Sequence, residues 1–411
     1  MSQPIGRRPM LGLSAVLALP SIARAQAQAL PLLKIGVLTD LSGAYRDNSG
    51  PTSVAAAKQA VEDFKPETHG FRMEILAADH QQKPDVGSSV ARQWFDRDGV
   101  DAVADVNNSA IAIAVRTQAI EKDKALLITG AASAELTGKW CSPNSVHWAP
   151  DTYSNSRSTG RALLQAGGKK WFLLVADYVF GHALEADTAA VVRAGGGEVV
   201  GVSRYPFPGN TDFSSFLLQA MSSGADVVAL CATGGDMENA VKQAAEFGVA
   251  RRGTRVAPMF GFITEIKSLG LPVAQGLFLT EPFYWNLNDR TRAFTTRFLP
   301  NAGDNYPSSL HACAYSGTTH YMKAAAAIGA EKMRSGKAAI AQMKAMPTDD
   351  DCFGHASIRA DGRFLADTHL FQVNTPAESK TPWDIFKLIS STPGAEAYRP
   401  LSESTCAMLK S

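Results

Sequence analysis

The sequence lacks an excess of charge of either sign. It carries 40 lysines and arginines against 39 aspartates and glutamates, so its formal net charge at pH 7 is +1. A chain this close to neutral has no field that would gather nucleic acid or an anionic membrane surface around it. We therefore expect no nucleic-acid partner.

Recognisable catalytic and metal-binding motifs are also missing. The chain has no G-x-S-x-G elbow, no Walker phosphate loop, no H-E-x-x-H motif and no C-x-x-C pair, and its eight histidines are scattered. The three adjacent acids at 349–351 are interpreted as a solvated loop. We expect no enzymatic activity, no cofactor and no bound metal; an exported hydrolase with an unrecognised site is the enzymatic alternative.

Long apolar runs are absent beyond the N-terminus. The run at 10–22 follows Arg7 and Arg8, and it is shorter than the roughly 20 residues that a membrane-spanning helix needs. Small residues around Ala27 suit a signal peptidase. We predict a signal peptide at 1–27, cleaved near Ala27 and exported by the Sec or the twin-arginine route, which places the mature protein in the periplasm.

Cysteine is scarce and its count is odd. Of the five cysteines, Cys231 and Cys313 lie in apolar or alanine-rich stretches and are interpreted as small buried hydrophobes. Cys141 and Cys406 lie in polar, loop-like contexts. They are the candidate pair for a disulfide in an oxidising compartment, although the sequence leaves other pairings open.

Short β-branched runs alternate with helix-length segments along most of the chain. This pattern is typical of parallel sheets wrapped by helices, and the roughly 384 residues left after removing 27 of 411 suggest two domains. The alternation is interrupted near residues 148–152 and again at 279–285, which are candidate crossings between lobes. From Cys352 onward a turn at 360–363 separates two extended runs and predicts antiparallel pairing.

In open α/β sheets, ligands bind beyond the carboxyl ends of the strands. The loop after the run at 102–106 reads Asn107-Asn-Ser-Ala110, where Asn108 or Ser109 would cap a helix and leave backbone N–H groups free for a carboxylate. The loop after 125–128 contains Ser133, which can both cap a helix and donate to a ligand. Two helix caps with no ligand are the alternative interpretation.

Other loops at the same edges supply further candidates. Tyr45 can close over a ligand and Arg46 can pair with an acid, although isolated side chains of this kind are more often solvated. In the second half of the chain, Gly235 permits close backbone approach. Asp236 can either cap the following helix or bind an ammonium group, and capping is the favoured interpretation.

Four segments together resemble a known family. They are 34–43 (KIGVLTDLSG), 128–137 (ITGAASAELT), 178–181 (YVFG) and 276–285 (GLFLTEPFYW). The mature chain is similar throughout to the type I periplasmic ligand-binding proteins of ABC importers, the leucine/isoleucine/valine-binding group. This resemblance implies two Rossmann-like α/β lobes with parallel central sheets, a three-crossing hinge, a ligand trapped as the lobes close, and delivery to a membrane permease without chemistry on the ligand.

The resemblance also implies the site. The ligand carboxylate would be held by loops that here contain Asn108, Ser109, Ala131, Ala132 and Ser133. Tyr45 would cover it. The resemblance also implies ligand contacts from the second lobe, made here by Tyr178, Gly235 and Asp236.

One segment departs from the family pattern. Where amino-acid binders of the family present an acid to the ammonium group, this chain has Phe262, Ile263 and Thr264, with Glu265 one position later. The departure argues against a standard α-amino acid and adds Phe262 to the candidate site.

Three further segments resemble the branch that binds aromatic carboxylates: 80–85, 283–285 and 381–384. Phe283, Tyr284 or Trp285 would stack on an aromatic acid, with packing at the hinge as the alternative role.

The expected boundaries are 28–149 and 282–368 for lobe 1, and 150–281 and 369–411 for lobe 2 with a C-terminal tail.

The expected function is therefore a monomeric periplasmic solute-binding protein for a small organic acid, served by an ABC permease in the inner membrane. The alternatives are a binder of branched-chain or other hydrophobic amino acids, and a sensing module for a membrane receptor.

Overall fold

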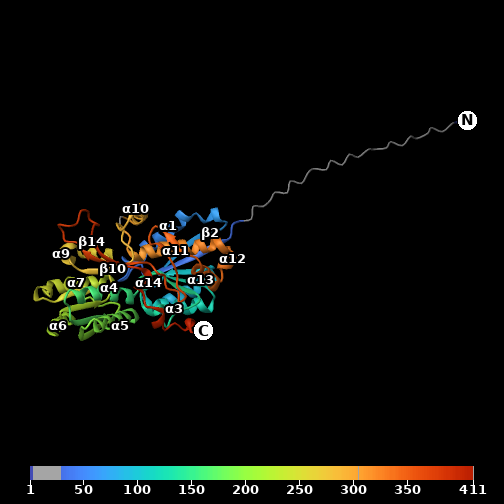
Figure 1. Cartoon of the computed structure of the whole chain (residues 1–411). Coiled ribbons are helices and arrows are strands. Elements are labelled where there is room, and N and C mark those ends of the chain that lie inside the picture. The colour runs from blue at the N-terminus through green and yellow to red at the C-terminus, as the bar shows by residue number, and fades with distance from the viewer. Residues whose placement is uncertain (3–28, 304, 411) are drawn as a thin grey trace.

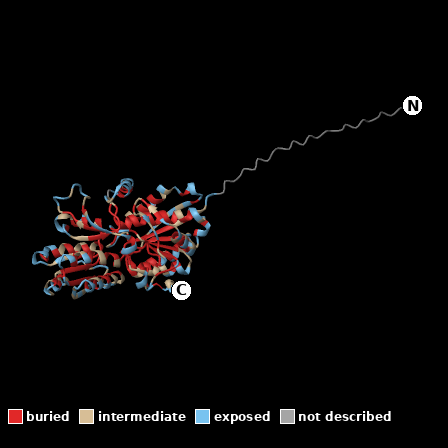
Figure 2. Cartoon of the chain, in the orientation of Figure 1, coloured by how far each residue is buried: buried red, intermediate tan, exposed pale blue. Residues whose placement is uncertain are grey.

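The computed structural model describes residues 1–2, 29–303 and 305–410. The predicted signal peptide and its cleavage site near Ala27 lie almost entirely outside the described residues. The rest forms two rounded bodies side by side, one built from the blue, cyan and orange parts of the chain and the other from the green and yellow parts (Figure 1). Buried residues fill the centre of both bodies (Figure 2).

The strands alternate with helices through the first 280 residues. Their bounds are β1 Leu32–Thr39, β2 Arg72–Asp79, β3 Ala102–Asp105, β4 Ala125–Ile128, β5 Ser145–His147, β6 Lys170–Ala176, β7 Glu198–Tyr205, β8 Val227–Cys231, β9 Arg255–Pro258, β10 Phe278–Glu281, β11 Thr348–Asp350, β12 Gly354–Ala356, β13 Thr368–Val373 and β14 Phe386–Thr392.

The helices cover the faces of the sheets. Their bounds are α1 Gly50–Phe64, α2 Pro84–Gln93, α3 Ser109–Glu121, α4 Thr152–Gln165, α5 Val179–Ala194, α6 Ser214–Ser222, α7 Gly234–Glu246, α8 Ile263–Leu269, α9 Leu271–Ala274, α10 Asp289–Phe298, α11 Ser309–Ile328, α12 Ala330–Met333, α13 Gly336–Ala345 and α14 Gly394–Ala397. A π-helical turn, Trp94–Asp98, extends α2.

Lobe 1 is built on a parallel sheet of order β2-β1-β3-β4-β5. Strands β3 and β4 are buried on both faces, which explains their continuous apolar sequence. Residues of α1, α10, α11 and α13 pack on one face, where Trp148, Phe294 and Tyr321 are buried. Residues of α2 and α3 pack on the other.

Lobe 2 repeats the plan with a parallel sheet of order β7-β6-β8-β9. Strand β8 is fully buried, and Cys231 at its end lies in the core as its apolar context predicted. Residues of α4 and α5 pack on one face. Residues of α6, α7 and α8 pack on the other. The fold predicted from the sequence, two α/β lobes with parallel sheets, is confirmed.

A third sheet, of order β10-β13-β14, is antiparallel. The chain passes between the lobes after β5, after β10, before β13 and again after β14, so this small sheet lies at the hinge. The antiparallel pairing predicted for the C-terminal part is present also as a bridge between Ile358 and Phe364, on either side of the turn at 360–363. In the described ranges 1–2, 29–303 and 305–410, every helix is too short or too polar to cross a membrane.

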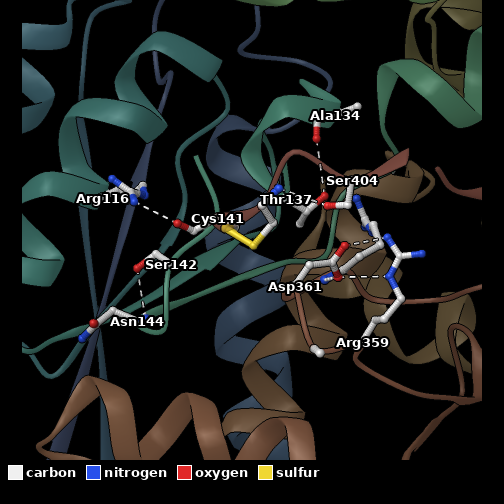
Figure 3. Close-up of a disulfide and its surroundings, with 12 residues drawn as sticks. Arg116, Ala134, Thr137, Cys141, Ser142, Asn144, Arg359, Asp361 and Ser404 are labelled. Carbon is white, nitrogen blue, oxygen red and sulfur yellow. Dashed lines mark hydrogen bonds and ion pairs between the residues drawn. A yellow bond between two sulfur atoms is a disulfide. The ribbon is translucent and has the colours of Figure 1, made fainter. Parts of the chain in front are cut away.

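The C-terminal tail after β14 returns to lobe 1. Cys406 and Cys141, the pair selected from the sequence, form a disulfide. Figure 3 shows this bond beside Ser404 and the ion pair between Arg359 and Asp361. The tail therefore closes a loop of 265 residues onto the first lobe.

Candidate functional site

The loop after β1 folds around a buried acid. The carboxylate of Asp40 accepts hydrogen bonds from the N–H groups of Gly43 over 2.6 Å and Tyr45 over 2.9 Å. A side chain that bonds to its own following backbone fixes a tight turn without regular structure. This turn carries Tyr45 to the edge of lobe 1 that faces lobe 2.

Asn107 ties this first loop to the loop after β3. Its Oδ1 accepts from the N–H of Asp40 over 3.2 Å and from Nε2 of His80 over 2.6 Å, and its Nδ2 donates to the carbonyl of Tyr45 over 3.3 Å. Burial lowers the pKa of His80, so its ring is neutral at pH 7. The position of Tyr45 is therefore fixed by a buried network that contains the carboxylate of Asp40 and the neutral ring of His80.

Helix α3 begins at this loop. Asn108 is the N-cap, and its Oδ1 accepts from the N–H groups of Ala110 and Ile111. Ser109 is the first helical residue, and its Oγ accepts from the N–H of Ser133 over 3.2 Å. The two loops that the sequence singled out as carboxylate-binding are therefore in direct contact.

The second of these loops presents unpaired backbone donors. Nε2 of His147 donates to the carbonyl of Ala131 over 2.7 Å, and burial holds the pKa of His147 well below its ordinary value. Within the part of the chain that the structure describes, no group accepts a hydrogen bond from the N–H of Ala131 or Ala132, although both residues are buried. Buried N–H groups are nearly always paired in native proteins, so these two donors mark a place for an acceptor.

The facing wall comes from lobe 2 and is organised by Glu265. Its carboxylate accepts from the hydroxyl of Thr233 over 2.9 Å, from the N–H of Phe262 over 2.7 Å and from the N–H of Gly234. Burial raises the pKa of Glu265 to about 7. Its oxygens are engaged with the protein itself, which leaves little acceptor capacity for a ligand ammonium group.

Three hydrogen bonds join the lobes across the site. The N–H of Gly235 donates to the carbonyl of Ala44 over 3.1 Å, Nδ2 of Asn48 donates to Glu265 over 3.4 Å, and the hydroxyls of Tyr45 and Tyr178 lie 2.5 Å apart. Gly234 has a φ of +67°, and a Cβ there would lie 2.3 Å from the carbonyl of Ala44. The lobes are closed, and a glycine is needed for this approach.

A small cavity lies between the closed lobes. Lobe 1 contributes mainly polar groups and lobe 2 mainly aromatic rings, with Phe260 edge-on to Phe180 and to Phe262. The cavity has a volume of about 20 Å³, which is little more than one water molecule needs. The lining residues are Tyr45, Asn48, Asn107, Ser109, Gly130, Ala132, Tyr178, Phe180, Thr233, Phe260, Phe262 and Leu310.

The structure brings most of the predicted residues together. Those that line the cavity are Tyr45, Ser109, Ala132, Tyr178 and Phe262. Four others are in the loops and helix starts that form its walls: Asn108, Ala131, Ser133 and Gly235. Arg46 is not among them, because its exposed guanidinium pairs with Asp47 outside the cavity.

The capping role favoured for Asp236 is wrong. Helix α7 begins at Gly234 after the N-cap Thr233, so Asp236 is its third residue. Burial raises the pKa of Asp236 to about 6. One of its carboxylate oxygens has no hydrogen-bond partner among the described residues, and Asp236 is not among the residues that line the cavity.

The aromatic cluster at 283–285 lies in the hinge. Phe283 packs edge-on to Phe294 in the lobe 1 core at 5.9 Å. The hydroxyl of Tyr284 accepts from the N–H of Ile385 over 3.2 Å, and the indole of Trp285 donates to the carbonyl of Trp383 over 2.8 Å. These contacts correspond to the packing alternative, and the three rings are not part of the cavity lining.

Sequence reasoning missed several lining residues. Asn107 and Phe180 stand within segments that were singled out, and Thr233 lies two positions before Gly235. Asn48 and Phe260 lie a few positions from such segments. Leu310 is the second residue of α11, far along the chain from the other lining residues, and carries no local signal.

A second buried acid lies behind the site. Glu281, at the end of β10, accepts from the hydroxyl of Ser309 over 2.9 Å, and its other oxygen has no partner among the described residues. Burial and the nearby Glu265 raise the pKa of Glu281 to about 8. In the described residues no three His, Cys, Asp or Glu side chains come together as a metal site requires.

A family model described as periplasmic binding protein matches residues 33–380. The chain belongs to this family. Curated relatives in Brucella abortus and other Brucella species, named Leu/Ile/Val-binding protein homolog 6, are 27% identical over 215 residues. These are 52% of this chain and 53% of theirs, so the match spans about half the length of the curated relatives.

Solved structures of the family superpose over nearly the whole chain. A periplasmic binding protein from Burkholderia mallei is 42% identical, with a TM-score of 0.88 over 92% of this chain and 98% of its own. A branched-chain amino acid ABC transporter periplasmic ligand-binding protein from Burkholderia xenovorans LB400 is 38% identical, with a TM-score of 0.79 over 92% and 99%. An ABC transporter solute-binding protein from R. palustris, solved with benzoate, shares the fold at 19% identity, with a TM-score of 0.79 over 92% and 99%.

Proposed function

We propose that this member of the family serves an ABC importer by capturing a small aromatic or related organic carboxylate between its lobes and delivering it to a membrane permease. In this proposal the protein acts in the periplasm as a monomer and leaves the ligand chemically unchanged. Ser109, Ala131 and Ala132 hold the carboxylate, while Tyr45 and Tyr178 cover it.

The unpaired N–H groups of Ala131 and Ala132 carry this proposal. Together with the hydroxyl of Ser109 at the start of α3, they offer donors to an anion where the helix dipole also favours negative charge. No lysine or arginine lines the cavity. Binding therefore depends on aligned neutral donors, as in sites where a buried carboxylate accepts several backbone hydrogen bonds.

The opposite wall favours an aromatic body on the ligand. Phe180, Phe260 and Phe262 line the lobe 2 side, and the neutral side chains around them offer no charged partner for a polar tail. Aromatic rings pack offset or edge-on against such walls and gain more than their buried area alone provides. The benzoate complex from R. palustris shows that the shared fold accommodates a ligand of this type.

An amino-acid ligand is the second candidate. The Burkholderia xenovorans neighbour is named for branched-chain amino acids, and it is 38% identical to this chain. An α-ammonium group would need an acceptor, however, and Glu265 is occupied by Thr233, Phe262 and Gly234. This occupancy favours the aromatic acid over the amino acid.

A thermal-shift screen tests the proposal. Benzoate and hydroxybenzoates should raise the melting temperature, since a ligand at 100 times its dissociation constant stabilises the folded state by about 2.7 kcal/mol. Benzamide and benzyl alcohol are matched controls that keep the ring and remove the charge. A shift with leucine or phenylalanine but with no aromatic acid would favour the second candidate, and mass spectrometry showing turnover of a bound compound would reveal an enzyme instead.

A further inference from the structure

The loop between β7 and α6 places an aromatic ring against two tyrosines that line the cavity. Phe207 stacks on Tyr178 with ring centroids 4.3 Å apart and planes inclined by 17°. It also stacks on Tyr45 at 5.3 Å and 23°. Phe207 itself is half-buried and does not line the cavity, so it touches the two tyrosines from outside.

The two contacts of Phe207 differ in what happens to them when the lobes part. Tyr178 and Phe207 both belong to lobe 2, and their stacking is internal to that lobe. Tyr45 belongs to lobe 1, so its stacking on Phe207 exists only while the lobes are closed. The hydroxyl contact between Tyr45 and Tyr178 crosses the same gap. Phe207 therefore stabilises the closed arrangement specifically.

We propose that Phe207 is a positioning residue that holds Tyr45 against Tyr178 and thereby sets how long a ligand stays in the closed cleft. This inference rests on the proposed function, because it requires a ligand between the lobes. A contact present only in the closed form raises the barrier to ligand release. It changes the association rate little, since the ligand enters while the lobes are apart.

The expected effect follows from the strength of stacked rings. A stacked pair contributes a factor of about 2 to 12 to an equilibrium beyond its buried area. Because truncation also removes the apolar contact area of the ring, Phe207→Ala should raise the dissociation rate of an aromatic carboxylate about 3- to 30-fold and leave the association rate within about 3-fold. Phe207→Tyr keeps the ring and should restore slow release. Phe207→Leu keeps apolar bulk without a ring face and should release faster than the wild type.

Phe216→Ala is the matched control. The ring of Phe216 contacts Tyr205 and Phe213, both within lobe 2. Its loss should lower the stability of the fold without changing the dissociation rate. A double-mutant cycle adds a second readout, because Phe207→Ala should have a smaller effect when Tyr45→Ala has already removed the partner ring.

Stopped-flow measurement of benzoate release from the full mature chain tests the inference. If the wild type binds no aromatic carboxylate, the proposed function fails. If the wild type binds benzoate and both Phe207→Ala and Phe207→Leu release it within 2-fold of the wild-type rate, the role of Phe207 is overturned. Faster release from both variants, restored by Phe207→Tyr and absent in Phe216→Ala, is the expected result.

Discussion

The guanidinium of Arg399 donates to the carboxylate of Asp187 over 2.8 Å. Arg399 belongs to the C-terminal tail that the disulfide holds on lobe 1, whereas Asp187 is on α5 of lobe 2. The other oxygen of Asp187 accepts from the hydroxyl of Thr152 over 2.7 Å, and the oxygen of Thr152 accepts from the N–H of Ala134 over 3.1 Å. The tail is thus connected by hydrogen bonds to the loop that we propose binds the carboxylate.

Removing this arginine should destabilise the fold. In Arg399→Met, Asp187 keeps the hydrogen bond from Thr152 but loses its cationic partner while remaining largely buried, and burial already raises the pKa of Asp187 to about 6. Because Arg399 is itself partly exposed, we expect a loss of about 1–3 kcal/mol in the free energy of unfolding, less than for a fully buried pair. Urea unfolding measures this, with Lys58→Gln on the exposed side of α1 as a control that should change little. Equal stability of the two variants would contradict the prediction.

Reducing the disulfide should also destabilise the protein. The bond between Cys141 and Cys406 joins residues 265 positions apart, and cross-links of native domains contribute about 2–5 kcal/mol. Denaturant unfolding with and without dithiothreitol measures the difference. The variant with both cysteines changed to serine is the control, and its midpoint should not respond to the reductant. An oxidised wild type no more stable than this variant would refute the prediction.

Two buried glutamates predict a dependence of stability on pH. Burial raises the pKa of Glu265 to about 7 and that of Glu281 to about 8, from an ordinary value of 4.5. The folded state therefore binds these protons more tightly than the unfolded state does. Their contribution to stability is complete below about pH 4.5 and is lost progressively as pH rises toward 8.

Buried histidines act in the opposite direction. Burial lowers the pKa of His311 to about 3, so its contribution is lost as pH falls below 6.5. The test therefore compares melting temperature as a function of pH in Glu281→Gln and in the wild type. Between pH 5 and pH 9 the melting temperature should fall less in the variant. Parallel profiles would show that Glu281 does not carry the dependence.

Two serines should affect ligand affinity unequally. Ser109→Ala removes a hydroxyl from the cavity wall and should weaken binding of an aromatic carboxylate about 10-fold or more, as for a lost hydrogen bond to a charged group. Ser133→Ala removes a hydroxyl that accepts from the N–H of Glu135 over 3.4 Å, and should weaken binding less. Isothermal titration with benzoate measures both, and circular dichroism checks the fold. Unchanged affinity in both variants would place the site elsewhere.

The fold was accessible from sequence because its signals are local. Strand β4 has the bounds that its apolar run at 125–128 predicted, since burial on both faces needs an uninterrupted apolar sequence. The three-residue strand β5, Ser145–His147, was missed because it is too short to show a pattern. The loops at 107–110 and 129–135 were found because small polar residues follow a buried strand.

The rest of the site depends on which segments meet in space. The cluster at 283–285 has the composition of a binding surface, yet its rings pack in the hinge because Trp383 and Ile385 return beside it. Leu310 and Phe207 are far along the chain from the loops that they approach. Asp236 was misassigned because a glycine pair, rather than the acid, begins the helix. Local patterns carry no information on such encounters.

The water-sized space between the lobes has a kinetic consequence. A benzene ring cannot enter it by diffusion, so uptake has to begin from a form in which Tyr45 and Tyr178 have separated. Departure depends on the same motion, because a ring enclosed there can leave only once the hinge swings apart. The protein can therefore empty no faster than that motion occurs, however little solute surrounds it.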